Sequence, residues 1–130
     1  MFDMMYEKAV KARNASYAPY SGFFVGASVL TDTGELFAGC NLENAAYGST
    51  QCAEANAIGS MVAAARTKVI ATLIVTDTPD GILPCGNCLQ ILTELGSQDT
   101  RIYICNLKGL RRETTLGKML PQGFDQAALK

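Results

Sequence analysis

Three cysteines and one glutamate in this chain have the types and spacing of a metal site with a proton carrier. The stretch "TQCAEANAIGS" places Glu54 two positions after Cys52, and "PCGNC" carries Cys85 and Cys88 three positions apart. A C-x-x-C pair is the usual first half of a zinc site. Because the sequence contains no histidine, zinc would have to be held by thiolates and carboxylates, and Ser-His-Asp and Cys-His nucleophilic chemistry are excluded.

The three thiols are predicted to lie at the starts of two helices. One helix is expected to begin near residues 49–52, and another after Pro84, which suits a first helical position. A helix start carries about half a positive charge, which lowers the pKa of a thiol and favours the thiolate that binds metal. Cys85 and Cys88 would share one face of the first turn. Two helix starts that meet would bring all three sulfurs together.

Glu54 is predicted to act beside such a metal rather than on it. Three protein ligands leave the fourth position of a tetrahedral zinc open, which is the mark of a catalytic site. Water there ionises near neutral pH and becomes a nucleophile. Side chains in a first turn lean toward the helix start, so Glu54 could face that water and carry its proton.

Other interpretations of the cysteines stay open at this point. A lone C-x-x-C also occurs as a redox pair, and cysteines are often simply buried. A closed, structural zinc site would need a fourth thiolate from Cys40 or Cys105. Cys40 lies at the end of a predicted strand and could reach the site, whereas Cys105 lies inside a predicted strand.

The elements that must position these residues follow from apolar periodicity and turn signals. The first three are an amphipathic helix over 2–15 and strands over 23–31 and 35–41, joined as a hairpin across "DTG". The later elements are a helix from 49–52 to about 65 capped by Ser49 or Thr50, a strand over 69–77, a helix from about 84 to 96, strands over 101–106 and 111–116, and short helical turns after Gly117.

This order predicts a single α/β domain over residues 1–130, with a mixed central sheet of about five strands and helices on both faces. A chain of 130 residues suits one core. Alternation of helices and strands in the middle of the chain favours parallel pairing there, whereas the opening hairpin is antiparallel. The expected architecture is therefore a three-layer α/β/α fold.

Composition excludes several classes of protein. Hydrophobic residues make up 48% and charged residues 18%, with net charge −1 and a pI near 5.3, so a folded protein without a polynucleotide-binding surface is expected. Arg111-Arg112 is the densest basic pair. The sequence has no apolar run of about 18 residues, the length that a membrane-spanning helix needs. The N-terminus lacks the basic start, apolar middle and small-residue cleavage site of a secretory signal. We expect a cytoplasmic protein whose five cysteines are thiols or metal ligands.

Six segments resemble, in order and spacing, the small zinc-dependent cytidine deaminases that act on free nucleosides. Zinc deaminases carry H-x-E or a three-cysteine variant, then P-C-x-x-C, with the Glu as acid and base; "CAE" followed by "PCGNC" matches the variant. The six segments are "SYAPYSGFFVGA" (16–27), "CNLENAAYG" (40–48), "CAEANAI" (52–58), "DTP" (77–79), "PCGNCLQ" (84–90) and "LPQGF" (120–124).

The resemblance implies a cytidine deaminase-like fold and hydrolytic deamination of cytidine and 2′-deoxycytidine to the uridines, with release of ammonia, in pyrimidine salvage. It implies one Zn²⁺ per chain held by Cys52, Cys85 and Cys88, with Glu54 as the catalytic acid and base. Two other substrate classes stay open: a modified cytidine or cytosine-nucleoside antibiotic on the same fold, and a single-stranded nucleic acid, which the acidic pI disfavours.

The resemblance also implies which residues contact substrate. Phe23 would line the nucleoside pocket, and Ala45 would offer backbone groups to the base. Asn41 and Glu43 would bind the sugar hydroxyls, and an amide paired with a carboxylate suits vicinal hydroxyls, which both donate and accept.

Members of the family commonly form homotetramers with shared active sites, so the same is expected here. Tyr47 would lie near the subunit interface, and Phe124 would reach the base bound by a neighbouring subunit. The stretch 57–65 is rich in glycine, serine and alanine. These small residues would let helices of two copies approach closely; the alternative is that the stretch packs against the sheet.

Two positions depart from the family pattern. Ala55 and Leu89 stand where the family usually has arginines that lie near the zinc thiolates. A divalent zinc with three thiolates carries one net negative charge, which opposes ionisation of water at the metal. Helix dipoles and backbone N–H groups near the sulfurs are expected to provide the compensation.

Overall fold

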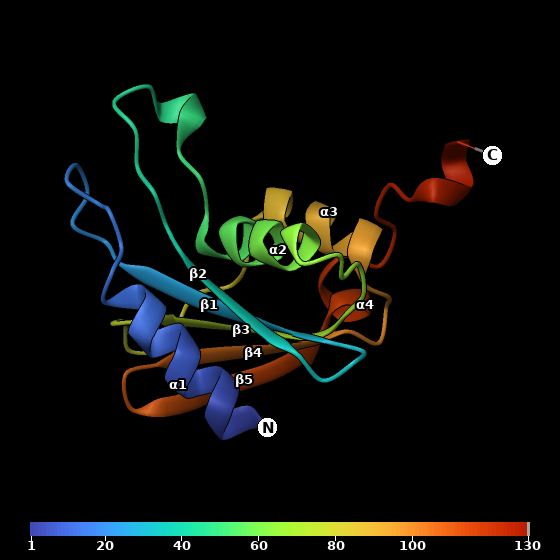
Figure 1. Cartoon of the computed structure of the whole chain (residues 1–130), viewed down its shortest axis with the longest axis horizontal. Helices are drawn as coiled ribbons and strands as arrows, with labels where there is room; N and C mark the ends of the chain where they lie inside the picture. Colours follow the sequence, from blue (N-terminus) through green and yellow to red (C-terminus); the bar gives the residue numbers. More distant parts are fainter. Residues whose placement is uncertain (130) are drawn as a thin grey trace.

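The structure, a computed structural model, describes residues 1–129 and places a five-stranded sheet between helices (Figure 1). The three-layer α/β/α arrangement and the mixed five-stranded sheet are confirmed; Lys130, the last residue of the predicted domain, lies outside the described residues. The elements are α1 (Phe2–Arg13), β1 (Val25–Thr31), β2 (Leu36–Cys40), η1 (Tyr47–Ser49), α2 (Ala53–Ala63), β3 (Val69–Thr76), α3 (Gly86–Leu95), β4 (Arg101–Asn106), β5 (Gly109–Thr115), α4 (Leu116–Met119) and η2 (Gln126–Leu129).

The topology brings the starts of two helices to one edge of the sheet. The strand order is β2-β1-β3-β4-β5. Strand β1 pairs antiparallel with both β2 and β3, so β2 and β3 run in the same direction. Helix α2 follows β2 and α3 follows β3, and both helices therefore start beyond the carboxyl ends of parallel strands. In α/β sheets this edge is where ligands bind.

Each face of the sheet has its own apolar core. On one face, α2 and α3 pack over a cluster that includes Met61, Leu92 and Ile104. On the other face, α1 contributes Met5 to a smaller cluster that contains Cys105. Figure 1 shows α2 and α3 on one side of the sheet and α1 on the other. No helix among residues 1–129 combines the length and the apolar character that a membrane crossing requires.

The start of α2 differs from the sequence-based prediction. Its N-cap is Cys52, and Ser49 ends η1, so the predicted cap at Ser49 or Thr50 is wrong. A bridge between Leu42 and Gln51 explains the difference, because their backbones exchange two hydrogen bonds of 2.9 Å. This bridge holds the chain extended up to the cap.

The start of α3 is also displaced from its predicted position. The N-cap is Cys85, with φ −72° and ψ 166°, and the helix begins at Gly86. The prediction that Pro84 occupies the first helical position is therefore wrong. Because the N-cap residue has extended backbone angles, the thiol of Cys85 projects from the end of the helix rather than from its side.

Candidate active site

Three thiols from the two helix starts come together. The Sγ atoms of Cys52 and Cys85 are 3.9 Å apart, and the sulfurs of Cys52, Cys85 and Cys88 all lie within 4.8 Å of one another. Tetrahedral zinc with Zn–S bonds of about 2.3 Å separates its sulfurs by about 3.8 Å. The three thiols are thus positioned to bind a metal ion, and the spacing fits zinc.

The metal cluster within residues 1–129 contains three thiols and no fourth. Cys105 is fully buried in the core on the α1 face of the sheet. Cys40 ends β2 and is likewise outside the cluster. Three thiols without a fourth protein ligand favour an open metal site over the closed structural site.

Backbone conformation aims the thiols at one another. Cys52 and Cys85 are both N-caps in extended conformation, with ψ values of 155° and 166°, and Cys88 lies one turn into α3. Both helices point the positive ends of their dipoles toward the sulfurs. The side chain of Cys52 makes no capping hydrogen bond to α2, which leaves its sulfur available to a metal.

The pKa values of the thiols reflect burial and crowding. Burial, followed by the nearby Cys85 and Glu54, raises the pKa of Cys52, and burial likewise raises the pKa of Cys88. Burial also opposes ionisation of Cys85, yet its pKa is lowered. The causes are hydrogen bonds to its sulfur from the backbone N–H and thiol of Cys88, from the thiol of Cys52 and from the backbone N–H of Asn87. Among residues 1–129, the groups that act on these pKa values include no lysine or arginine.

Glu54 lies beside the thiols, in the first turn of α2. Its side chain is buried, with 5% of its surface exposed, and burial raises the pKa of its carboxyl above the usual value. A carboxyl with a raised pKa can both accept and return a proton near neutral pH. Glu54 is not among the atoms of the three-thiol cluster, which fits a proton carrier better than a ligand.

A hollow of about 200 Å³ lies over this site. The thiols of Cys52 and Cys85, the Glu54 side chain and Asn41 all line it. The sequence did not single out its other lining residues, which are Val25, Thr50, Gln51, Ala53, Ile82 and Leu83. A signal was present for two of them, because Gln51 and Ala53 directly flank Cys52 in the sequence.

A second hollow of about 270 Å³ adjoins the first and shares Thr50 with it. Its other lining residues are Tyr20, Ser21, Glu43, Asn44 and Tyr47. Asn41 and Glu43, the two residues expected to bind sugar, therefore line neighbouring parts of one recessed surface. Phe23 is 39% exposed and is not among the residues that line either hollow.

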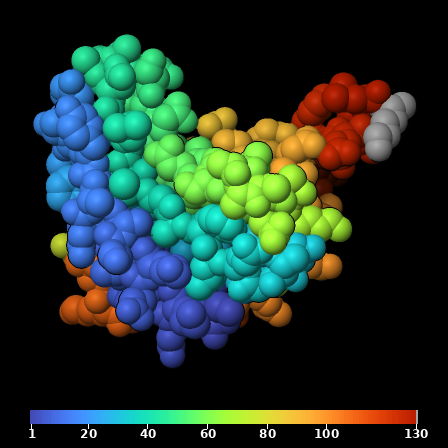
Figure 2. All heavy atoms as spheres, viewed as in Figure 1, coloured from blue at the N-terminus to red at the C-terminus, as the bar shows by residue number. Residues whose placement is uncertain are grey.

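The predicted interface residues are exposed in the single chain. Tyr47 is 85% exposed and Phe124 is 62% exposed. Ala45 is exposed as well, on the loop between β2 and α2. In Figure 2 this loop, in green, and the C-terminal tail, in red, project from opposite sides of the molecule. Neither Tyr47 nor Phe124 lines the hollow over the metal cluster of the same chain, although Tyr47 lines the adjoining one.

The two departures from the family pattern lie in α2 and α3. Ala55 is half-buried in the first turn of α2. Leu89 is 7% exposed and packs in the core beneath α3. Within residues 1–129, no cation replaces the missing arginines among the groups that act on Cys52, Cys85 and Cys88.

Comparison with known proteins gives a consistent result. The model of the family described as "Cytidine and deoxycytidylate deaminase zinc-binding region" matches residues 3–105. The chain is 41% identical to the cytidine deaminase of Halalkalibacterium halodurans over 121 residues, 93% of this chain and 92% of that protein. It is also 41% identical to the cytidine deaminase of Sporosarcina psychrophila, with 92% and 88% covered. The crystal structure of cytidine deaminase from Burkholderia pseudomallei superposes with a TM-score of 0.90 at 40% identity, covering 95% of this chain and 99% of that one.

Proposed function

The chain belongs to the zinc-binding cytidine and deoxycytidylate deaminase family, and on that premise we propose how its residues perform the reaction. The protein is a hydrolase that deaminates cytidine, with zinc as cofactor. One observation carries the assignment of roles: Cys52, Cys85 and Cys88 meet at two helix starts with the buried carboxyl of Glu54 beside them. In this proposal the three thiolates hold the metal and Glu54 moves the protons.

Zinc, when bound, supplies Lewis-acid activation of water. Glu54 takes the proton that the attacking water loses and delivers it to the ring nitrogen next to the amine-bearing carbon. It then takes the second proton, from the hydroxyl now bonded to that carbon, and passes it to the leaving amine as the C–N bond breaks, so cytidine and water give uridine and ammonia. The burial that raises the pKa of Glu54 supports this role, because the carboxyl must hold a proton between the two transfers.

We propose that the substrate binds across the two adjoining hollows. Asn41 and Glu43 would bind the sugar hydroxyls, Ala45 would offer its backbone to the base, and Phe23 would flank the nucleoside. The position of Asn41 in the metal hollow and of Glu43 in the adjoining one supports this arrangement. Both cytidine and 2′-deoxycytidine are proposed substrates, in pyrimidine salvage.

The oligomeric state and location are proposals as well. A homotetramer would place Tyr47 at an interface and carry Phe124 to the site of a neighbouring subunit. The exposure of both side chains is compatible with this proposal, because it leaves them accessible to a neighbouring subunit. A cytoplasmic location is consistent with five free thiols.

A substrate panel tests the proposed function. Purified, zinc-loaded protein is mixed with cytidine, 2′-deoxycytidine, a 5-substituted cytidine and a cytosine-containing single-stranded oligonucleotide, and the release of ammonia is measured. We expect release from the two nucleosides and none from the oligonucleotide. Turnover only on the modified cytidine would identify a retuned deaminase, and full zinc content without turnover on any substrate would contradict the proposal.

A further inference from the structure

The carboxylate of Glu43 is held by the turn that precedes β1. Its Oε1 accepts hydrogen bonds from the backbone N–H groups of Tyr20 at 3.0 Å and Ser21 at 3.1 Å. Its Oε2 accepts a short hydrogen bond from the hydroxyl of Ser21. Three donors on two consecutive residues thus fix one carboxylate that lines the hollow next to the metal site.

The Ser21 hydroxyl also accepts a hydrogen bond. The backbone N–H of Phe23 donates to the Ser21 hydroxyl oxygen at 3.0 Å. Gly22 makes this return possible, because its φ of +66° lies in the left-handed region that favours glycine. Because an ionised carboxylate can only accept, the hydroxyl donates its proton to Glu43 while its oxygen accepts from Phe23. Ser21 therefore connects Phe23 and Glu43, two proposed substrate contacts.

We propose that Ser21 is a positioning residue that orients the Glu43 carboxylate for a single sugar hydroxyl. A carboxylate offers about four acceptor positions, and the turn occupies three of them. The remaining position, on Oε2, can accept one further hydrogen bond. This inference rests on the proposed function, because it assumes that Glu43 meets the sugar.

Asn41 likewise has few hydrogen-bonding positions left for a sugar hydroxyl. Its Oδ1 accepts from the backbone N–H of Val25 at 3.0 Å, and its Nδ2 donates to the carbonyl of Phe23 at 2.8 Å. One acceptor position and one N–H remain on this amide. Asn41 and Glu43 would then each serve one hydroxyl, and both are held ready by the segment from Tyr20 to Val25. Such preorganisation lowers the entropy lost on binding.

Electrostatics supports the contact. The Ser21 hydroxyl is the largest cause of a lowered pKa at Glu43, ahead of the backbone N–H groups of Ser21 and Tyr20. The charged carboxylate is thus the form that the turn favours. A carboxylate fixed in its charged form is a better acceptor for a sugar hydroxyl than a mobile one that water solvates on all sides.

The test is Ser21→Ala, with steady-state kinetics on cytidine. Removing the hydroxyl should leave kcat nearly unchanged and raise KM roughly three- to tenfold, because a charge-assisted hydrogen bond that orients the carboxylate is lost. Ser21→Thr keeps a hydroxyl and should restore most of the binding. With 2′,3′-dideoxycytidine, which has no sugar hydroxyls at these positions, Ser21→Ala should leave kcat/KM unchanged.

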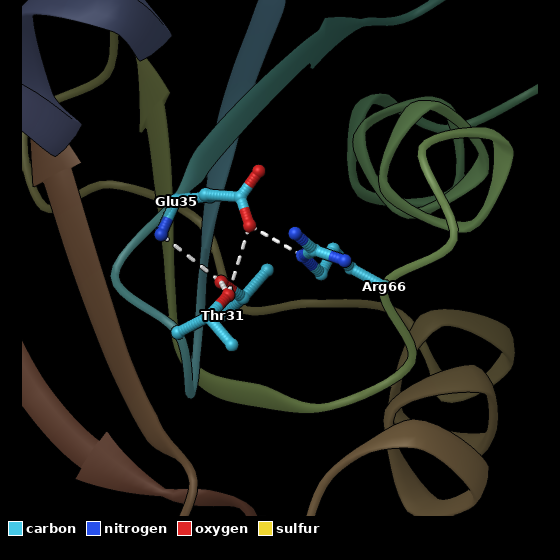
Figure 3. A network of polar contacts seen from close by, with 4 residues as sticks. Thr31, Glu35 and Arg66 are labelled. Atoms are coloured by element: carbon cyan, nitrogen blue, oxygen red, sulfur yellow. Dashed lines mark hydrogen bonds and ion pairs between the residues drawn. The ribbon is translucent and has the colours of Figure 1, made fainter.

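The matched control lies at the other end of the β1–β2 hairpin. There the Thr33 hydroxyl donates to the Glu35 carboxylate at 2.9 Å, and Glu35 also pairs with Arg66 (Figure 3). Thr33→Ala removes a hydroxyl–carboxylate contact of the same kind far from the metal site and should leave both kinetic constants unchanged.

A double-mutant cycle with Glu43→Ala asks whether Ser21 acts through the carboxylate. In that background, Ser21→Ala should raise KM no further. An equal KM effect in both backgrounds, an equal effect on the dideoxy substrate, or no effect in the wild type would overturn the proposal. Failure of the proposed function can be told apart from failure of this inference, because in that case the unmodified protein would turn over no cytidine.

Discussion

At the scale of single residues, we expect the backbone to offset the negative charge of the metal site. No lysine or arginine among residues 1–129 acts on the pKa of the three thiols. The lowered pKa of Cys85 comes from the N–H groups of Cys88 and Asn87 together with the thiols of Cys88 and Cys52. Both helices add the positive ends of their dipoles. The expectation drawn from Ala55 and Leu89, that dipoles and amides would compensate, is consistent with this geometry.

The first prediction concerns Ala55→Arg, which restores the arginine usual in the family. If helix ends already offset the thiolate charge, kcat/KM should change by less than about threefold, with zinc content unchanged, because the effect of a further cation is partly screened. Ala55→Gln controls for side-chain length without charge. A many-fold rise in kcat/KM for the arginine variant alone would show that the backbone is insufficient.

The second prediction concerns protons and zinc. Burial raises the pKa of Cys52 and Cys88, so both thiols hold their protons at neutral pH in the absence of metal. Zinc requires thiolates, so binding should release about two or more protons at pH 7, and affinity should fall as pH falls.

Calorimetry of zinc binding in buffers with different heats of ionisation measures this release. Cys40→Ser and Cys105→Ser are the controls, since neither thiol belongs to the cluster, and both variants should release the same number of protons as the wild type. Release of less than one proton would mean that the thiols are already ionised.

At the scale of elements, the site depends on two helices that start at the same edge of the sheet. The sequence could predict both helices, the strands before them and the meeting of the three thiols. It could not predict the caps. Ser49 and Thr50 have better capping side chains than Cys52, but the bridge between Leu42 and Gln51 keeps that segment extended. This bridge joins distant residues, so local propensity does not reveal it.

The third prediction tests how closely α2 must approach β2. A Cβ at Gly39 would lie 2.4 Å from the backbone nitrogen of Ala57 and 2.7 Å from the carbonyl oxygen of Ala53. Gly39→Ala should therefore push α2 away from β2, lower stability by about 1–3 kcal/mol, and reduce zinc retention because Cys52 and Glu54 move with the helix.

Gly59→Ala is the matched control on α2 itself, where an added Cβ meets nothing within 4 Å. This variant should keep its zinc and gain up to about 1 kcal/mol of stability from helix propensity. Thermal unfolding and zinc per chain report both effects. Equal behaviour of the two alanine variants would show that the close approach of α2 to β2 is unimportant.

At the scale of the whole molecule, the sequence predicted the layers, the mixed sheet and the order of the elements. It could not predict which of the expected substrate-contact residues line the metal hollow of their own chain and which do not. Asn41 and Glu54 line the metal hollow. Tyr47 and Phe124 are highly exposed and do not line it. Their exposure depends on tertiary placement, and their roles depend on copies of the chain that one sequence does not describe. Phe124 is held at its carbonyl by Gln90 Nε2, at 2.6 Å.

The fourth prediction tests whether Phe124 completes a neighbouring site. Phe124→Ala should weaken cytidine binding, and Glu54→Gln should abolish turnover. If sites are shared, mixed oligomers of the two variants should regain activity above the sum of the separate samples, since some sites combine an intact Glu54 with a neighbour's intact Phe124. Light scattering gives the mass of the assembly. A monomer, or no gain on mixing, would contradict the shared site.

The most direct measurement pairs zinc per chain with cytidine turnover for wild type and Glu54→Gln. Glutamine keeps the size of the side chain but cannot carry the proton, so we expect one zinc per chain in both proteins and at least a hundredfold loss of kcat in the variant, in the range typical of general acid–base catalysis. Full zinc content with near wild-type turnover in Glu54→Gln would contradict the role of Glu54 as the proton carrier.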